Sequence, residues 1–150
     1  MLRTKAWMVA ATVAVAAALG GCDARGPVAT EALELSRPVP QDLSRIVFYT
    51  PANPLAWAVT DTNVFVNRRR VGRMLRDGVF WADVAPGRQV ISTSAEVGVS
   101  TVIATQPGEV VFVELGGGVG NALQHVSPRQ VPEDEGRAAI AGKRMTGTDF

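Results

Sequence analysis

Five arginines lie close together in the middle of the chain, within the stretch NRRRVGRMLR. They are Arg68, Arg69, Arg70, Arg73 and Arg76. A guanidinium group is a planar fork that matches the oxygens of phosphates and carboxylates. The first four are therefore candidate anion-binding residues, with anionic lipid headgroups or peptidoglycan carboxylates as ligands. A solvated hairpin whose charges protect a strand edge would carry the same residues.

Other residue types that do chemistry are sparse. His125 is the only histidine, and a zinc site needs several histidine, cysteine or acidic ligands, so we expect no metal. The chain has no G-x-S-x-G nucleophile motif, and its single cysteine cannot form an intramolecular disulfide. We therefore expect no catalytic residues, no cofactor and a protein that is not an enzyme.

The N-terminal residues have the composition of a secretory signal. Arg3 and Lys5 precede an apolar run, residues 6–19, that only Thr12 interrupts. A membrane-crossing helix needs about 20 apolar residues, whereas a basic start, a shorter apolar middle and a small-residue end are typical of a signal peptide. We expect residues 1–21 to be this signal, helical in the unprocessed chain.

The cysteine follows this run in the sequence LGGC, from Leu19 to Cys22. The stretch resembles the lipobox of bacterial lipoproteins, which has an aliphatic residue, two small residues and then cysteine. The resemblance implies a diacylglyceryl group on the sulfur of Cys22, cleavage after Gly21, acylation of the new amine and an anchor in the lipid bilayer. An ordinary secretory signal with an incidental cysteine is the alternative.

Asp23 and the net charge bear on location and partners. Aspartate after the lipidated cysteine resembles the signal that keeps lipoproteins in the inner membrane, so we expect an inner-membrane anchor with the domain facing the periplasm. Removal of residues 1–21 takes two of the 15 basic residues and none of the 14 acidic ones, which leaves a formal charge of −1. We expect no nucleic-acid partner for such a chain.

The composition after the signal changes near residue 43. Residues 22–42 hold Gly26, Pro27, Pro38 and Pro40 among small and charged residues and are predicted to be a lipidated tether. The segment TEALEL within it is too short to be a stable helix alone. Residues 43–144 are predicted to be the folded domain, and residues 145–150 a loose tail.

The sequence of this domain predicts a series of strands. Apolar residues alternate or cluster in short runs, and turn residues separate the runs at intervals of 8–12 residues, which favours a small β-sandwich. Pro132 and the three acidic residues after it predict the start of a short C-terminal helix. The strand-like runs are RIVFYT, NVFVN, RVGRML, GVFWADV, RQVISTSA, STVIATQ, EVVFVEL and HVSPRQV.

The middle of the chain resembles the DUF2846 type of bacterial lipoprotein domain. The matching pieces are RIVFYTP, VFVNRRRVGRM, GVFWADVAPGRQVISTS, QPGEVVFVELG and EDEGRAAIA, from Arg45 to Ala141. Similar sequence segments occur in PEGA-type and carboxypeptidase-regulatory-like sandwich domains. The resemblance implies an all-β, immunoglobulin-like antiparallel β-sandwich and a location in the cell envelope, and it brings no catalytic residues. The first hairpin has Asn67-Arg68 where family members commonly have Asp-Gly.

These observations lead to two functional hypotheses. The first is a membrane-anchored envelope lipoprotein that presents its sandwich as a non-enzymatic accessory or interaction module, binding an envelope protein by strand addition. The alternative is a module that binds glycan or anionic lipid through the Arg68–Arg76 hairpin and exposed aromatics. Trp57, Phe80 and Trp81 are the candidate aromatics, although we expect such rings to pack in the core or between the sheets more readily than to form an exposed binding surface. The oligomeric state stays open.

Overall fold

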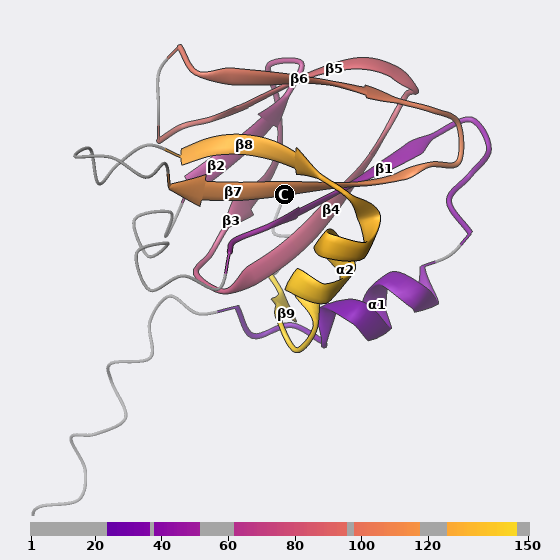
Figure 1. Cartoon of the computed structure of the whole chain (residues 1–150), viewed down its shortest axis with the longest axis vertical. Helices are drawn as coiled ribbons and strands as arrows, with labels where there is room; N and C mark the ends of the chain where they lie inside the picture. Colours follow the sequence, from indigo (N-terminus) through magenta and orange to yellow (C-terminus); the bar gives the residue numbers. More distant parts are fainter. Residues whose placement is uncertain (1–23, 37, 52–61, 96–97, 118–125, 147–150) are drawn as a thin grey trace, which may run out of the picture.

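The computed structural model describes residues 24–36, 38–51, 62–95, 98–117 and 126–146. Within them the chain forms two β-sheets packed face to face, with two short helices beside the larger sheet (Figure 1). The predicted β-sandwich with a short helix near the C-terminus is confirmed. The predicted signal-peptide helix, residues 1–21, lies outside the described residues, as do Cys22 and Asp23.

The larger sheet has the strand order β8-β7-β1-β4-β9, and the smaller sheet has the order β3-β2-β5-β6. The predicted strand runs coincide with observed strands, which confirms them. In chain order the elements are α1 (Ala29–Leu35), β1 (Ser44–Tyr49), β2 (Thr62–Val66), β3 (Arg69–Met74), β4 (Gly78–Val84), β5 (Gly87–Thr93), β6 (Ser100–Thr105), β7 (Val110–Gly117), β8 (Val126–Val131), α2 (Glu133–Ile140) and β9 (Arg144–Met145).

Two ladders of the larger sheet are parallel. β1 pairs antiparallel with β4 but parallel with β7, and β4 pairs parallel with β9. The expectation of an antiparallel sandwich is therefore wrong at these two ladders. A parallel pair needs a long crossover connection, and the chain supplies one between β1 and β7 by building the whole smaller sheet in that interval.

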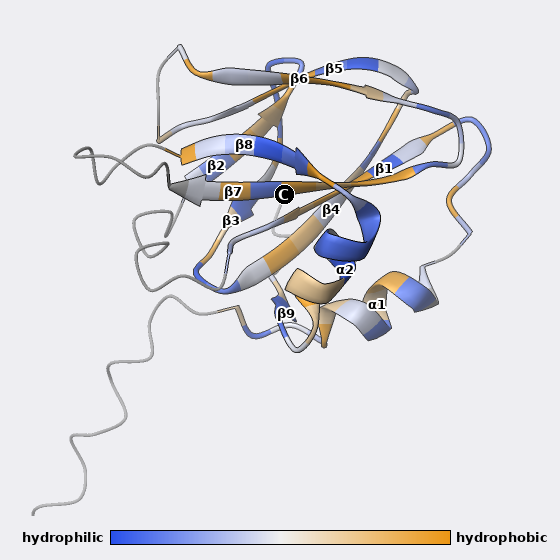
Figure 2. Ribbon diagram, viewed as in Figure 1, coloured by the Kyte–Doolittle hydropathy of each residue, from blue (hydrophilic) through white to orange (hydrophobic). Residues whose placement is uncertain are grey.

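Strand β1 is buried along its whole length because both of its faces are covered. On one face Phe48 stacks on Phe80 with ring centroids 5.0 Å apart, and the Ser44 hydroxyl donates to Thr105 of the smaller sheet at 2.8 Å. On the other face Val47 and Tyr49 lie under the helical layer, fully buried. Figure 2 shows that the first turns of α2 are hydrophilic and that its end is more apolar.

The segment before the sandwich is docked on it. Backbone hydrogen bonds join Gly26 N to Met145 O at 3.0 Å, Met145 N to Pro27 O at 2.9 Å and Ala29 N to Lys143 O at 2.9 Å. Ala29 and Leu33, one helical turn apart, are 0% and 1% exposed. Tertiary packing of this apolar stripe stabilises a helix that is too short to persist alone.

Two predicted boundaries are therefore wrong. Residues 24–36 are part of the folded domain and do not form a free tether. The predicted tail begins too early, because Met145 belongs to β9 and Thr146 is 3% exposed. Local composition carries no information about contacts between segments more than a hundred residues apart, such as those between residues 26–29 and 143–145.

A partly buried ion pair between β1 and β4 also holds the end of α1. Arg45 Nε and Nη2 donate to the two carboxylate oxygens of Asp83 at 2.7 Å each, and its Nη1 donates to the Ser36 carbonyl at 3.0 Å. The guanidinium carbon also lies 5.0 Å from the centroid of the Trp81 ring. Such a bidentate, charge-assisted pair fixes geometry as well as adding stability.

Helix α2 lies close against β7 because Gly136 faces Phe112. A β-carbon on Gly136 would lie 2.3 Å from a ring carbon of Phe112, which is far inside van der Waals contact. The absence of a side chain at this one position therefore sets the distance between the helix and the sheet.

Replacing Gly136 by alanine tests this contact. Helix propensity alone would stabilise the variant by about 1 kcal/mol, but overpacking costs about 1–3 kcal/mol. We expect Gly136→Ala to lower the free energy of unfolding in urea. The exposed Ala138→Gly variant measures the propensity effect in the same helix. A Gly136→Ala protein more stable than the wild type would show that α2 is not held by this contact.

The β2–β3 turn has an unusual backbone. Asn67 and Arg68 have φ angles of 50° and 68°, the pattern of the type I′ turn that matches strand twist in two-residue hairpins. Asn67 fits this position, because its side chain donates to Gln89 Oε1 at 2.8 Å and accepts from Val90 N at 2.9 Å. Arg68 is not a residue type that adopts this backbone readily, because the left-handed conformation costs an L-residue with a β-carbon about 1–2 kcal/mol.

The backbone strain at Arg68 predicts that replacing this residue by glycine raises the free energy of unfolding. Glycine adopts positive φ freely, although it also adds entropy to the unfolded chain. We expect Arg68→Gly to raise the free energy of unfolding by about 0.5–1 kcal/mol, measured by urea denaturation. Asn67→Gly, which loses the two side-chain hydrogen bonds, should lower it. A loss of stability in Arg68→Gly would contradict the assignment of strain.

Candidate functional site

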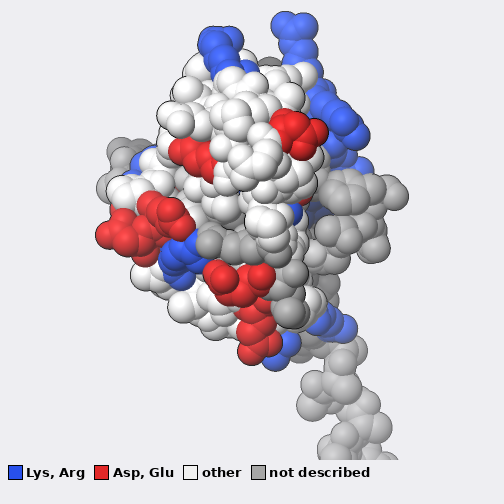
Figure 3. Space-filling view, turned by 90° about the vertical axis from the view of Figure 1, so that its right-hand side faces the viewer, with Lys and Arg blue, Asp and Glu red and all other residues white. Residues whose placement is uncertain are grey.

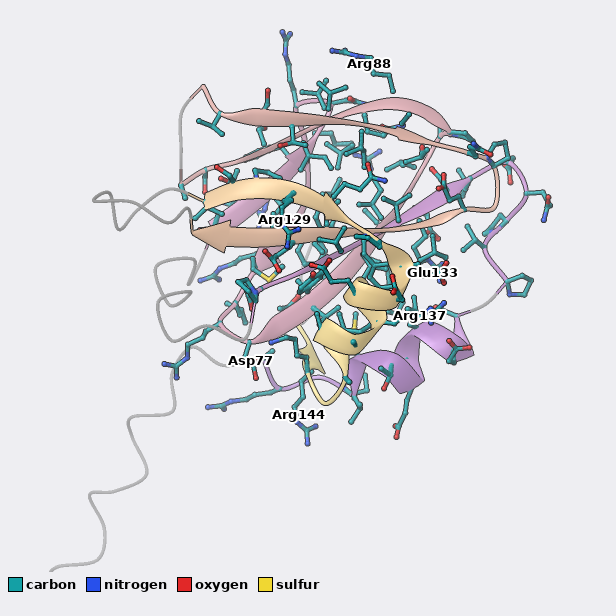
Figure 4. The ribbon with its side chains drawn as sticks, viewed as in Figure 1. Asp77, Arg88, Arg129, Glu133, Arg137 and Arg144 are labelled. Atoms are coloured by element: carbon teal, nitrogen blue, oxygen red, sulfur yellow. The ribbon has the colours of Figure 1, made fainter. Side chains whose placement is uncertain are left out.

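The predicted anion-binding arginines lie on the β2–β3 hairpin, at the edge of the smaller sheet. Arg68 is in the turn, and the others are on β3, whose only ladder partner among the described strands is β2. Arg68, Arg69, Arg70 and Arg73 are all exposed. Figure 3 shows Lys and Arg side chains projecting from the top of the molecule, the end at which Figure 4 places Arg88.

A β-bulge distributes these arginines over two faces. The register shifts between Val64 and Phe65, so that Arg70 pairs with Phe65 and Arg73 pairs with Asn63. Phe65 and Asn63 share one face of β2, because residues alternate along a strand. The extra residue of the bulge therefore brings Arg70 and Arg73 to the same, outer face, where an unbroken strand would have separated them.

Arg69 belongs to a different environment. It lines an open groove of about 460 Å³ together with Arg88, and we call this the arginine groove. Its walls are apolar, from Val66, Val71 and Val84. The groove lies where the β2–β3 turn meets the β4–β5 turn, and the Asn67 side chain holds the two turns together through Gln89 and Val90.

The structure thus brings together only part of the predicted set. Arg69 lines the arginine groove, whereas Arg68, Arg70 and Arg73 do not. Arg88 was missed by sequence reasoning. Its position directly after Pro86-Gly87 marks it as the first residue beyond a hairpin turn, which is the signal that could have placed it at the same end of the sandwich as Arg69.

The aromatic residues do not form an exposed binding surface among the described residues. Phe80 is 2% exposed and lies between the sheets, and the half-buried Trp81 packs against the core with Arg45 over its ring. Phe80 therefore lies in the core and Trp81 is partly buried against it, as expected for rings that pack between the layers, and neither is a fully exposed binding ring. Trp57 lies outside the described residues.

A second polar cluster connects β1, β7, β8 and α2. The Tyr49 hydroxyl donates to Glu114 at 3.4 Å, and Arg129 donates to Glu114 at 3.2 Å and to Glu135 at 3.0 Å. Burial, followed by the charge of Glu114, raises the pKa of Tyr49 well above its usual value. Tyr49 therefore remains a protonated hydrogen-bond donor at neutral pH, and the cluster acts as a cross-link between elements.

The described residues contain no group of three or more His, Cys, Asp or Glu side chains arranged to hold a metal ion. They also include no helix long and apolar enough to cross a membrane. His125 lies outside the described residues. Of the arrangements described above, the arginine groove has the clearest ligand chemistry: two arginines and several apolar residues line it, a combination that can bind an anion that carries an apolar or sugar body.

The comparisons with known proteins bear on the sandwich. Residues 40–126 match the family described as "Protein of unknown function (DUF2846)", and no curated protein matches the chain. The matched segment includes strands β1 to β7 and leaves α1, α2 and β9 outside. Since the match spans more than half of the 150 residues, the chain belongs to the DUF2846 family.

Proposed function

We propose that this protein is a lipoprotein of the bacterial cell envelope, anchored by lipid on Cys22, whose sandwich is a non-enzymatic interaction module. The observation that carries the proposal is the sequence from Leu19 to Cys22, a lipobox at the end of a signal-like segment. The fold supports it, because the first described residue, Ala24, already packs on the domain. Asp23 favours the inner membrane, with the domain in the periplasm.

The lipid would anchor the protein durably. Each buried methylene contributes about 0.8 kcal/mol, and one acyl chain alone binds a membrane only marginally. A diacylglyceryl group and an amide-linked chain on one cysteine supply two or three chains. The anchored protein would then stay on the membrane without a spanning helix.

The sandwich offers a strand edge to an envelope protein partner. The smaller sheet ends in β3 and β6. β3 carries three arginines, which discourage pairing with another strand, whereas β6 carries no charged residue. Val102 of β6 is also the large hydrophobic residue most exposed among the described ones, at 50%. An extended segment of a partner could therefore add to the sheet along β6.

Replacing Cys22 tests the anchor. A Cys22→Ser chain lacks the sulfur that accepts the diacylglyceryl group, so we expect it to incorporate no labelled palmitate and to keep residues 1–21. The matched Asp23→Ser chain, which retains Cys22, should be labelled and cleaved. Metabolic labelling and mass spectrometry of the mature N-terminus measure both. A mature wild-type chain that begins at another residue, or that carries no lipid, would contradict the proposal.

A second candidate function is recognition of peptidoglycan carboxylates by the arginine groove. Two observations favour it: Arg69 and Arg88 line one groove, and Arg68 beside them is kept at a positive φ where glycine would be unstrained. Backbone strain is found preferentially at functional sites, and Arg68 has such strain at an exposed turn. The acetylated sugars of peptidoglycan would then contact the apolar walls of the groove.

Charge-matched variants distinguish binding in the arginine groove from general electrostatic attraction to the sacculi. We expect retention on purified peptidoglycan sacculi to fall with added salt and to drop about tenfold in Arg69→Ser/Arg88→Ser, because hydrogen bonds to charged groups contribute about 1.5–3 kcal/mol. Arg25→Ser/Arg144→Ser removes the same charge elsewhere and should retain binding. Equal loss in both pairs, or loss in neither, would rule out the groove as a carboxylate site.

A further inference from the structure

Among the described strands, three of the four that lie at sheet edges are protected against pairing with another strand. β9 is covered by the backbone of residues 26–29, β3 carries three exposed arginines, and β8 contains Pro128, which has no N–H to donate. β6 has neither a charged residue nor a proline. Of the described edges, that of β6 is therefore the one at which such protection is missing.

The hydrogen bonds of β5 show which backbone groups of β6 point to this edge. The Asn67 N–H donates to the Val90 carbonyl at 2.8 Å, and the Val90 N–H donates to the Asn67 side chain at 2.9 Å, so both groups of Val90 point toward β2. Val90 lies opposite Val102 in the antiparallel ladder of β5 and β6. Opposed residues in such a ladder exchange either both hydrogen bonds or none, so the N–H and C=O of Val102 point away from β5. By the same alternation, those of Ser100 and Ala104 point to the edge as well.

A second β6 strand, antiparallel to the first, matches these groups. With a two-fold axis at Val102, perpendicular to the smaller sheet, Val102 lies opposite its own copy and Ser100 lies opposite Ala104 of the other strand. Each of these pairs has its N–H and C=O groups directed at one another and can exchange two hydrogen bonds. An axis at Ile103 would pair only Val102 with Ala104 within β6, so the register centred on Val102 uses the edge more fully.

The same register covers the exposed apolar surface of β6. Val102 is 50% exposed, and Val90, its ladder neighbour on β5, is half-buried. In the joined sheets these valines and their copies form a row across the outer face, where cross-strand apolar pairs are stabilising. No like charges lie opposite each other, because β6 carries no charge.

The larger sheet leaves room for this pairing. β8 packs against β5 as well as against β6, and the Thr101 hydroxyl of β6 donates to the Pro128 carbonyl of β8. β8 therefore lies beneath the smaller sheet, and the edge of β6 remains accessible. Figure 1 shows β6 at the surface of the molecule, with β8 beside it.

We propose that the partner at this edge is a second copy of the chain, and that two sandwiches join through antiparallel pairing of their β6 strands. The proposal rests on the interaction role proposed above and names the occupant of that edge. Two-fold homodimers, in which one surface patch contacts itself, are the commonest oligomers, and a neutral, self-complementary strand suits such a contact. A ladder of six residues is small beside the interfaces of about 1,200–2,000 Å² that stable complexes bury. Confinement of anchored copies to one membrane raises their effective concentration and favours the pair.

Disulfide formation through introduced cysteines tests the register. Opposed residues of a hydrogen-bonded antiparallel pair have α-carbons about 5.5 Å apart, within the range that a disulfide spans. The mature lipidated Val102→Cys protein is reconstituted in vesicles of phosphatidylethanolamine and phosphatidylglycerol and mildly oxidised. Ala104→Cys, which faces the same side of the same strand, is the matched control, because its copy would lie about 13 Å along the strand. Non-reducing electrophoresis should show dimers of Val102→Cys forming about tenfold faster, since a disulfide needs α-carbons within about 7 Å.

A mixture of two variants tests the same register independently. Ser100→Cys chains mixed with Ala104→Cys chains should cross-link to each other faster than either chain cross-links to itself. Adding Val102→Lys to both chains should reduce this cross-linking to the collision rate, because like charges directly opposite each other are destabilising.

The outcomes distinguish failure of the pairing from failure of the anchor. Equal rates for Val102→Cys and Ala104→Cys, or cross-linking unchanged by Val102→Lys, would overturn pairing through β6 while the protein still carries lipid and floats with the vesicles. A chain without lipid on Cys22 would overturn the anchor instead, and disulfides mapped to residue 102 in concentrated solution would still report the register. Near-ultraviolet circular dichroism verifies that each variant keeps the wild-type tertiary packing.

Discussion

The backbone hydrogen bonds between residues 26–29 and 143–145 are the constraint on which the account depends. They bring the start of the described chain onto its end and complete one edge of the larger sheet. The Arg45 fork then attaches the end of α1 to the same sheet through Ser36 and Asp83. Because of these contacts, the exit of the chain toward Cys22 has one position relative to the sandwich.

This constraint separates two ends of the domain with different chemistry. At the end near Ala24, Lys143 pairs with Asp77, and Arg144 donates to the Gly26 carbonyl. At the other end, two hairpin turns held together by Asn67 form the arginine groove. If Cys22 is lipidated as proposed, the end near Ala24 would lie toward the membrane, and the end with the arginine groove would remain available to a ligand or partner.

The sequence was sufficient to predict the strands and the C-terminal helix, because these follow from local alternation and turn residues such as Pro86-Gly87. It could not predict that β1 runs parallel to β7, since the direction of a partner strand leaves no local pattern. The docking of α1 was missed for a similar reason. Its apolar positions, Ala29 and Leu33, are too few to indicate a helix until the surface that covers them is known.

The candidate site was predicted only in part, because long-range contacts decide which arginines it contains. The arginine cluster is visible as composition, but the bulge at Val64 and Phe65 determines which arginines share a face, and only the fold brings Arg88 beside Arg69. The burial of Phe80 and Trp81 agrees with the expectation that such rings pack in the core, but the contact of Arg45 with Trp81 could not be predicted from composition. Long-range contacts, which composition does not encode, thus decide the site.

The central claim is that residues 24–29 are already part of the folded domain, and amide hydrogen exchange tests it most directly. The account predicts that the amides of Gly26, Ala29 and Met145 are protected to a degree comparable with those of β1, because local openings of docked backbone are rare. Exchange of these three amides at the rates of an unstructured chain, with β1 still protected, would contradict it.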